Sequence, residues 1–338
     1  MRNRLDRTPA RSTARGYRGR MDSLGDAPAI VARGLTKRFG KVLALDGLDL
    51  EVPQGVVFGL LGLDGAGKTT TMRLLTGLAR PTSGSVAVGG VPVRFGNGLA
   101  ARRRIGVLGQ EPQFYGWMTG RELLSFVAAL VGVARRDVPA RVEETLQRVG
   151  LDDVADTRVL GYPGDMRQRL GIGQALIGKP EVLLLDEPVS SIDPEGRRDL
   201  LTLIGELRGS ATVVMATHVL SDVEAVCDRV AILEEGRLVI ESPVAELLGQ
   251  VAVPAYIIET DAGPGLALAG LAARLEREPW VGNVTISRTT LRITVTDEER
   301  ANAELPPAIV GTGLSISAFL RERATLEDVL VKLTGVDQ

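Results

Sequence analysis

The chain has 338 residues, of which 44% are hydrophobic, and its formal net charge is -2 at pH 7. This length predicts roughly two domains and a sizeable core, and the balanced charge gives no signature of a polyanion-binding protein. The only cysteine, Cys227, excludes an internal disulfide framework and suits a reducing compartment; we expect it to be a small buried side chain behind a helix. Because no apolar run approaches the roughly 20 residues of a membrane helix, we expect that the chain does not cross a bilayer by itself.

Residues 1–27 resemble a tail. They contain arginines spread among small and polar residues, at Arg2, Arg4, Arg7, Arg11, Arg15, Arg18 and Arg20. No apolar segment follows, which excludes a secretory signal. We favour a disordered leader, or a start at Met21, over a basic arm that touches nucleic acid or anionic lipid.

A small antiparallel sheet is predicted next. Residues 30–35 form a first strand, and residues 48–52 alternate as a half-buried strand. Further on, two short apolar runs bracket Gly89-Gly90, which is a hairpin signal. These strands precede and follow the segment described next, so we expect the sheet to flank it.

That segment is Gly62-Leu63-Asp64-Gly65-Ala66-Gly67-Lys68-Thr69, a complete G-x-x-x-x-G-K-T pattern. A buried strand is predicted before it at 56–61, and a helix after it from Thr70 to Leu75. Strand, glycine loop and helix together predict a phosphate-binding loop whose amides point at the β- and γ-phosphates of a nucleotide. Lys68 is expected to reach the phosphates, and the Thr69 hydroxyl to bind Mg²⁺.

The stretch 105–112 contains a predicted strand that ends on Gln110. Amphipathic helices are expected between 119 and 150. The apolar run that begins at Val182 predicts a strand buried on both faces. It ends in Asp186 and Glu187, at the sheet edge where ligands collect. Asp186 is expected to bind Mg²⁺, and Glu187 to polarise the attacking water as a general base.

Another buried strand, 213–218, ends on His218, the only histidine of the chain. A lone histidine is usually structural, but the end of a core strand in this sheet favours a functional role. Ser221 and Glu224 have the spacing of a capping box that opens the next helix.

These motifs occur in the order and at the spacing of the nucleotide-binding subunit of an ABC transporter, which residues 28–248 resemble. The resemblance implies that adenine stacks on Phe39 and that Gln110 contacts Mg²⁺ and senses the γ-phosphate. It also implies that Asp193, in Ser190-Ser191-Ile192-Asp193-Pro194, reaches the partner subunit. The residues it assigns to nucleotide binding are Phe39, Gly62, Leu63, Asp64, Gly65, Ala66, Gly67, Lys68, Thr69, Thr70, Gly164 and Asp193; those for metal are Thr69, Gln110 and Asp186; those for catalysis are Glu187, His218 and Gln110.

The family's signature motif departs from its usual form. Its serine position is Pro163 and its second glycine is Asp165, with Gly164 between them. In this family the serine hydroxyl and glycine amides contact the γ-phosphate bound to the opposite subunit, whereas proline has neither hydroxyl nor N–H. Either a homodimer hydrolyses ATP poorly and a second, different cassette is needed, or a shifted loop presents Gly164 well enough.

Residues 253–338 are expected to form a ferredoxin-like α+β domain with a regulatory or dimer-stabilising role. Predicted elements are a strand at 255–260, a helix at 264–277, a hairpin at 284–295, a helix at 297–310 and a strand at 314–319. Thr325-Leu326-Glu327-Asp328 reads as a capping box that opens a last helix. Such a C-terminal extension is similar to those of type-2 exporter ATPases, which include drug and antibiotic exporters.

The expected fold is therefore α/β: a P-loop NTPase core with an antiparallel β subdomain and a helical subdomain, plus a small C-terminal α+β domain. The resemblance implies an ATPase that uses ATP and Mg²⁺ and drives a separate integral membrane permease, from a peripheral position on the cytoplasmic face. It would act as a homodimer or as a heterodimer with a second cassette, and no specific nucleic acid is expected. A soluble ABC ATPase acting on nucleic acid or the ribosome, and a regulatory subunit with little turnover, remain alternatives.

Overall fold

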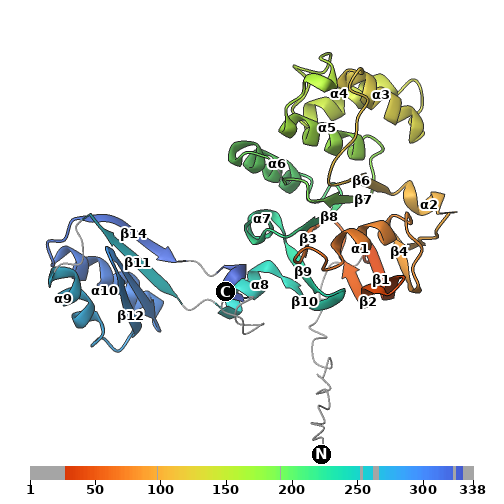
Figure 1. The fold of residues 1–338 in the computed structure, drawn as a ribbon. Helices are drawn as coiled ribbons and strands as arrows, with labels where there is room; N and C mark the ends of the chain where they lie inside the picture. The colour runs from red at the N-terminus through yellow and green to blue at the C-terminus, as the bar shows by residue number, and fades with distance from the viewer. Residues whose placement is uncertain are drawn as a thin grey trace, which may run out of the picture.

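The computed structural model describes residues 27–96, 98–190, 192–251, 254–261, 266–322 and 325–329. Nearly all of the predicted tail and the end of the predicted last helix lie outside these ranges. A central α/β body carries a helical body on one side, and a smaller α+β unit stands apart from both (Figure 1). Among the described helices, none has the length and apolar character needed to cross a bilayer.

A six-stranded sheet forms the centre, in the order β10-β9-β3-β8-β7-β6. Its strands run parallel except β10, which pairs antiparallel with β9 at one edge. All residues of β3, β7 and β8 are buried, which explains their unbroken apolar sequences. The strands are β3 (Val57–Leu61), β6 (Ile105–Leu108), β7 (Val182–Asp186), β8 (Thr212–Thr217), β9 (Arg229–Glu234) and β10 (Arg237–Pro243).

The predicted antiparallel sheet is confirmed, with strand order β2-β1-β4-β5. Its buried residues share one core with helix α1 and with Phe58 and Leu184 of the central sheet. The first strand is longer than predicted and ends at Phe39. The elements are β1 (Ile30–Phe39), β2 (Val42–Val52), α1 (Lys68–Leu75), β4 (Ser83–Val88) and β5 (Val91–Pro92).

The other face of the central sheet packs on helices α5 (Gly164–Leu176), α6 (Pro194–Glu206) and α7 (Leu220–Val226). Because side chains alternate along a strand, the neighbours Leu184 and Leu185 belong to opposite cores. Because β3, β8 and β7 are parallel neighbours, their carboxyl ends lie side by side at the same end of the sheet.

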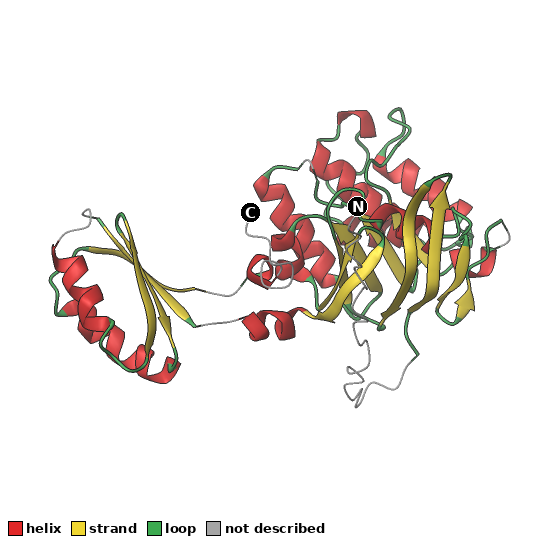
Figure 2. Ribbon diagram, turned by 60° about the horizontal axis from the view of Figure 1, so that its bottom comes forward, coloured by secondary structure: helices red, strands yellow, loops and turns green. Residues whose placement is uncertain are grey.

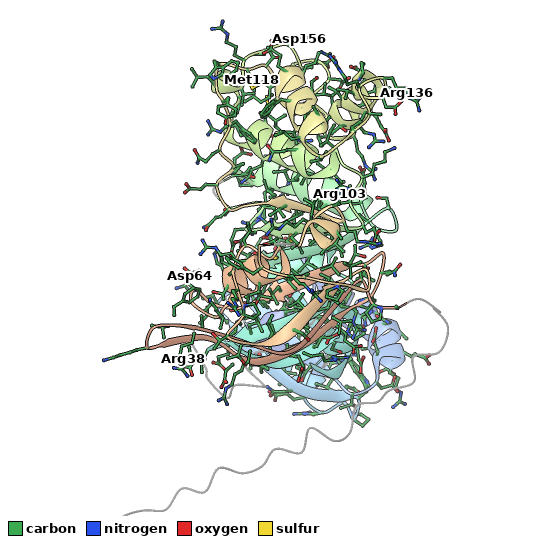
Figure 3. The ribbon with its side chains drawn as sticks, turned by 90° about the vertical axis from the view of Figure 1, so that its right-hand side faces the viewer. Arg38, Asp64, Arg103, Met118, Arg136 and Asp156 are labelled. Carbon is green, nitrogen blue, oxygen red and sulfur yellow. The ribbon has the colours of Figure 1, made fainter. Side chains whose placement is uncertain are left out.

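The helical body contains α3 (Gly120–Leu130), α4 (Val138–Arg148) and the outer part of α5, with the short η1 (Val159–Gly161) beside them. The short helix α2 (Leu99–Arg102) lies instead next to β5 and β6. Thr119 and Glu122 form a capping box at the start of α3. Met118, Arg136 and Asp156 lie in this body, well above Asp64 of the phosphate loop (Figure 3). The predicted helical region is confirmed as two helices.

Two local predictions are wrong. Strand β6 ends at Leu108, so Gln110 lies beyond the strand, after Gly109. Ser221 does not cap α7, because that helix already begins at Leu220 and its N-cap residue is Val219. The chain turns directly after β8, and the hydroxyl of Thr217, not of Ser221, accepts a hydrogen bond from the Val219 amide at 3.1 Å.

The C-terminal unit has the element order β-α-β-β-α-β and an antiparallel sheet in the order β12-β13-β11-β14. This is the split β-α-β arrangement of ferredoxin-like folds. Both helices cover one face, around Trp280, Ile293 and Leu305. The elements are β11 (Ala255–Thr260), α9 (Leu266–Leu275), β12 (Val281–Ser287), β13 (Thr290–Val295), α10 (Glu298–Val310) and β14 (Ile316–Glu322).

After this unit the chain returns to the central body. Helix α8 (Val244–Val251) is the last element before the unit, and Thr325–Val329, the return segment, comes after it. The predicted cap of this segment is confirmed, since Thr325 and Asp328 exchange hydrogen bonds. Leu326 and Val329 are buried in the core that also contains Leu247. The C-terminal unit, which Figures 1 and 2 show standing apart, is thus an insertion between two segments of the central body.

Cys227 is buried as predicted, at the end of α7, and burial raises the pKa of its thiol to about 12. The reactive thiolate is therefore scarce, and reagents cannot reach it. We expect the native protein to react with a thiol reagent at pH 8 at least tenfold more slowly than the same protein in denaturant, where one thiol per chain should be titrated. Equal rates in both conditions would contradict the burial of Cys227.

Candidate nucleotide-binding site

The phosphate loop joins the end of β3 to the start of α1. Gly67 is the N-cap residue of α1 and has a φ of 106°, in the region that favours glycine. A Cβ atom there would lie 2.7 Å from Leu45 Cδ2 and 2.8 Å from the Ala44 carbonyl oxygen, so only glycine fits. The loop therefore ends in the free amides of a helix N-terminus, which attract phosphate.

A hairpin that was not predicted from the sequence supports this loop from behind. The turn between β9 and β10 has positive φ at both Glu235 and Gly236. The Gly236 amide donates to the Ala66 carbonyl at 3.1 Å, and its own carbonyl accepts from Asp46 at 2.9 Å. A two-residue turn ending in glycine between apolar strands is the signal that would have predicted it.

Lys68 lies at the centre of the loop with 6% of its surface exposed. Its ammonium donates to the carbonyl oxygens of Gly62 at 2.6 Å and Leu63 at 3.2 Å. It also lies 3.8 Å from Glu187 Oε1. The loop thus curls around a positive charge, which can bind the phosphates of a nucleotide.

Asp186 ends β7 and is 7% exposed. Burial raises the pKa of its carboxyl, and a hydrogen bond with Thr69 acts in the opposite direction. Its Oδ1 atom has no hydrogen-bond partner among the described residues. A buried acceptor without a partner is costly unless a cation satisfies it, so Asp186 and Thr69 fit Mg²⁺. The metal, when bound, would neutralise charge on the phosphates.

Glu187 adopts a left-handed backbone conformation, with a φ of 49°. Such a conformation costs about 1–3 kcal/mol and persists where neighbours fix it. The Glu187 amide donates to Ala216 of β8 at 2.9 Å, and its carbonyl accepts from the Ser190 hydroxyl at 2.9 Å. These bonds direct the buried carboxylate toward the phosphate loop.

His218 follows β8, and its Nδ1 atom lies 2.9 Å from Glu187 Oε1. The ring is half exposed, whereas the carboxylate that it contacts is nearly buried. Glu187 thus lies between Lys68 and His218, each from a different element. The structure brings together the four predicted residues Lys68, Asp186, Glu187 and His218, with Thr69 beside them.

The other predicted residues lie on separate surface segments. Phe39, at the end of β1, is 48% exposed and carries the Lys37 ammonium 4.6 Å from its ring centre. This exposure favours a stacking surface over an ordinary core side chain. Asp193 caps α6 by accepting from the amides of Glu195 and Gly196. Leu63, Asp64, Gly65 and Thr69 are exposed, Gly62 and Thr70 are half-buried, and Ala66 and Gly67 are buried.

Gln110 lies beyond β6 and lines a cavity of about 450 Å³. Gly164 and Gln168 of α5 also line this cavity. The predicted nucleotide contacts Gln110 and Gly164 therefore face one cavity between the central and helical bodies. Ser191, which was part of the motif before Asp193, lies outside the described residues.

A phosphate loop, a buried acid with a free oxygen and a glutamate between lysine and histidine define a P-loop protein that binds nucleoside triphosphates. A family model described as ABC transporter matches residues 45–190. The chain is 35% identical to the "Uncharacterized ABC transporter ATP-binding protein YxlF" of Bacillus subtilis (strain 168), over 88% of this chain and 97% of that protein. The chain belongs to the ABC transporter family, as one of its ATP-binding ATPases.

Two further similarities agree with this assignment. The chain is 36% identical to the "Daunorubicin resistance ATP-binding protein DrrA3" of Streptomyces coeruleorubidus, over 92% of this chain and 97% of that one. Among solved structures, cbiO1 from Clostridium perfringens, described as part of the ABC transporter complex cbiONQ, has a TM-score of 0.62 at 25% identity. That likeness covers 67% of this chain and 92% of the solved chain.

The position of Glu187 leads to a prediction for two variants. Glu187→Gln keeps the shape of the side chain but removes the base, so the ATP turnover of the assembled transporter should fall by roughly 10²–10⁴-fold with ATP affinity retained. Lys68→Ala, in contrast, should sharply weaken ATP binding itself, as calorimetry would show. Wild-type turnover in Glu187→Gln would exclude Glu187 as the general base.

Proposed function

We propose that this chain hydrolyses Mg-ATP on the cytoplasmic face of a membrane and thereby drives export through a separate integral membrane permease. The observation that carries the proposal is the buried Glu187 carboxylate between Lys68 and His218, next to an Asp186 oxygen that has no partner in the described part of the chain. The Streptomyces relative is named for daunorubicin resistance, which supports export as the direction of transport.

Each residue has a distinct role in this proposal. Lys68 and the amides at the start of α1 bind the phosphates, and Thr69, Asp186 and Gln110 contact Mg²⁺. Glu187 accepts a proton from the attacking water, and His218 orients the γ-phosphate. Phe39 stacks on adenine; such stacking typically contributes about 1–3 kcal/mol and tolerates any base.

The helical body offers a docking surface for the permease. We define the aromatic patch as Tyr115, Trp117, Phe126 and Leu160, whose exposed fractions are 57%, 69%, 43% and 81%. The ring centre of Tyr115 lies 6.0 Å from that of Trp117 and 6.3 Å from that of Phe126, and the Leu160 amide donates to the Gly116 carbonyl, so the patch is continuous. Exposed aromatic side chains grouped in this way are typical of the anchors of protein interfaces.

The occupant that we propose for the aromatic patch is a cytoplasmic segment of the permease. The patch adjoins the Gln110 cavity, which Gly116 and Leu160 also line. A partner seated there would therefore contact the segment that carries the predicted γ-phosphate sensor. This proximity gives transport and ATP binding a common structural element.

The aromatic patch predicts a loss of assembly in a single variant. Trp117→Ala should weaken co-purification with the permease by roughly 30-fold in affinity, since truncation of a central tryptophan costs about 2 kcal/mol or more. Phe95→Ala is the matched control, because Phe95 is another exposed aromatic side chain, at 57%, but lies on the antiparallel-sheet side. Equal losses in both variants, or none in either, would reject the aromatic patch as the docking surface.

The altered signature favours a second proposal, that two copies of this chain form a poor ATPase. Pro163 is the N-cap residue of α5 and makes no side-chain cap, and Asp165 adds a carboxylate to the first turn. Two like charges 4 Å apart at an effective dielectric of 20 repel by about 4 kcal/mol, which is the upper scale for Asp165 against a phosphate. A heterodimer with a second cassette whose signature is intact would restore one full site.

The signature yields a prediction for the purified chain. Its steady-state ATPase rate should be low, and the double variant Pro163→Ser/Asp165→Gly should raise it at least tenfold at unchanged ATP affinity. Asp199→Asn serves as a control for removal of an acidic side chain from the neighbouring helix. Brisk turnover of the wild-type chain, with no gain in the double variant, would support a shifted loop that presents Gly164.

A further inference from the structure

The position of His218 depends on the short helix that follows it. Helix α7 begins at Leu220 and has no side-chain cap at its N-terminus. Between this helix and β8 lie only His218 and Val219, and the half-exposed ring makes one hydrogen bond, to Glu187, among the described residues. A shift of α7 would therefore move the ring relative to the Glu187 carboxylate.

One side of α7 is attached to α6 by an ion pair between the buried Asp222 and the partly exposed Arg197. Asp222 is 1% exposed, and its Oδ1 atom accepts from Arg197 Nε at 2.8 Å and Nη2 at 2.7 Å. Burial raises the pKa of Asp222, and the contact with Arg197 opposes this. Arg197 lies one helical turn beyond Asp193, whose carbonyl accepts a hydrogen bond from the Arg197 amide.

The other side of α7 is attached to the return segment. The carboxylate of Glu224 accepts a hydrogen bond from the Leu326 amide, at the start of the helical turn that Thr325 and Asp328 cap. Leu326 and Val329 are buried in the same core as Val223 and Val226 of α7. Residues two apart on a helix point in nearly opposite directions, so Asp222 and Glu224 secure α7 from two sides.

We propose that Asp222 and Glu224 are positioning residues for ATP hydrolysis. They place His218 against Glu187 by fixing α7 between Arg197 of α6 and the return segment. Because Glu224 contacts the return segment that follows the C-terminal unit, it connects that unit to His218 and Glu187. This inference rests on the proposed function, because it takes Glu187 and His218 as the groups that act on ATP.

The single histidine of the chain provides a direct readout. With ¹³C- or ¹⁵N-labelled histidine, and a purification tag that contains none, the protein gives only the ring signals of His218. Glu224→Ala should shift these signals, and Glu224→Gln, whose amide oxygen can still accept from Leu326, should return them close to wild type. Glu224→Ala is the cleaner variant, since Asp222→Asn also changes the charge near the ring.

Turnover in the assembled transporter is the second readout. Glu224→Ala and Asp222→Asn should lower kcat by roughly tenfold to a hundredfold, as small misplacements of reacting groups do, while the Kd for ATP stays within about twofold. The matched control is Asp199→Asn, which breaks the 3.1 Å ion pair of α6 with Arg169 but does not face α7. It should change neither the His218 signals nor kcat.

The inference is wrong if Glu224→Ala leaves the His218 signals and kcat at wild-type values, even if its melting temperature falls, since Glu224 would then be a structural anchor only. It is also wrong if Asp199→Asn produces the same shifts. Failure of the proposed function is a separate result: Glu187→Gln would then keep its turnover, whatever the histidine signals show. If Asp222→Asn does not fold, the Glu224 pair of variants still decides the matter.

Discussion

The pairing of a buried lysine with a buried glutamate is the constraint on which the rest of the site depends. Lys68 and Glu187 each expose less than a tenth of their surface, and ions taken out of water are costly unless each finds a partner. Carbonyl oxygens of the phosphate loop satisfy the lysine, and His218 contacts the glutamate. The loop carbonyls follow β3, Glu187 follows β7 and His218 follows β8. The pair therefore requires these strands to be neighbours in the central sheet.

The strained conformation of Glu187 has the same origin. An ordinary β-strand continuation would carry the side chain along the sheet, away from Lys68. The left-handed turn, fixed by Ala216 and Ser190, instead directs it across the edge of the sheet. The strain is located where three strand ends meet, at the residue proposed to act on water, as is common in functional sites.

Much of this could be predicted from the sequence, because the strongest patterns are local. Buried strands give unbroken apolar runs, and the phosphate loop has glycines at positions such as Gly67 where no other residue fits. What escaped prediction depends on distant segments. The support of Ala66 by Gly236 and the pair of Arg197 with Asp222 each join residues that no local pattern relates. The start of α7 was misplaced because the chain turns directly after β8, where the Thr217 hydroxyl accepts from the Val219 amide and the helix begins before Ser221.

The return of the chain after the C-terminal unit has a consequence for biosynthesis. Ala255 and Glu322 are paired neighbours in one sheet, so the unit can fold as a closed module while its two ends remain together. Leu326, however, emerges from the ribosome only after that module has been made. At about 5–20 residues per second, the central body waits several seconds for the segment that completes its core around α7. During this interval the apolar surface later covered by Leu326 and Val329 is open to solvent. Helix α7 is then held by Arg197 but not yet by the contact of Glu224 with Leu326.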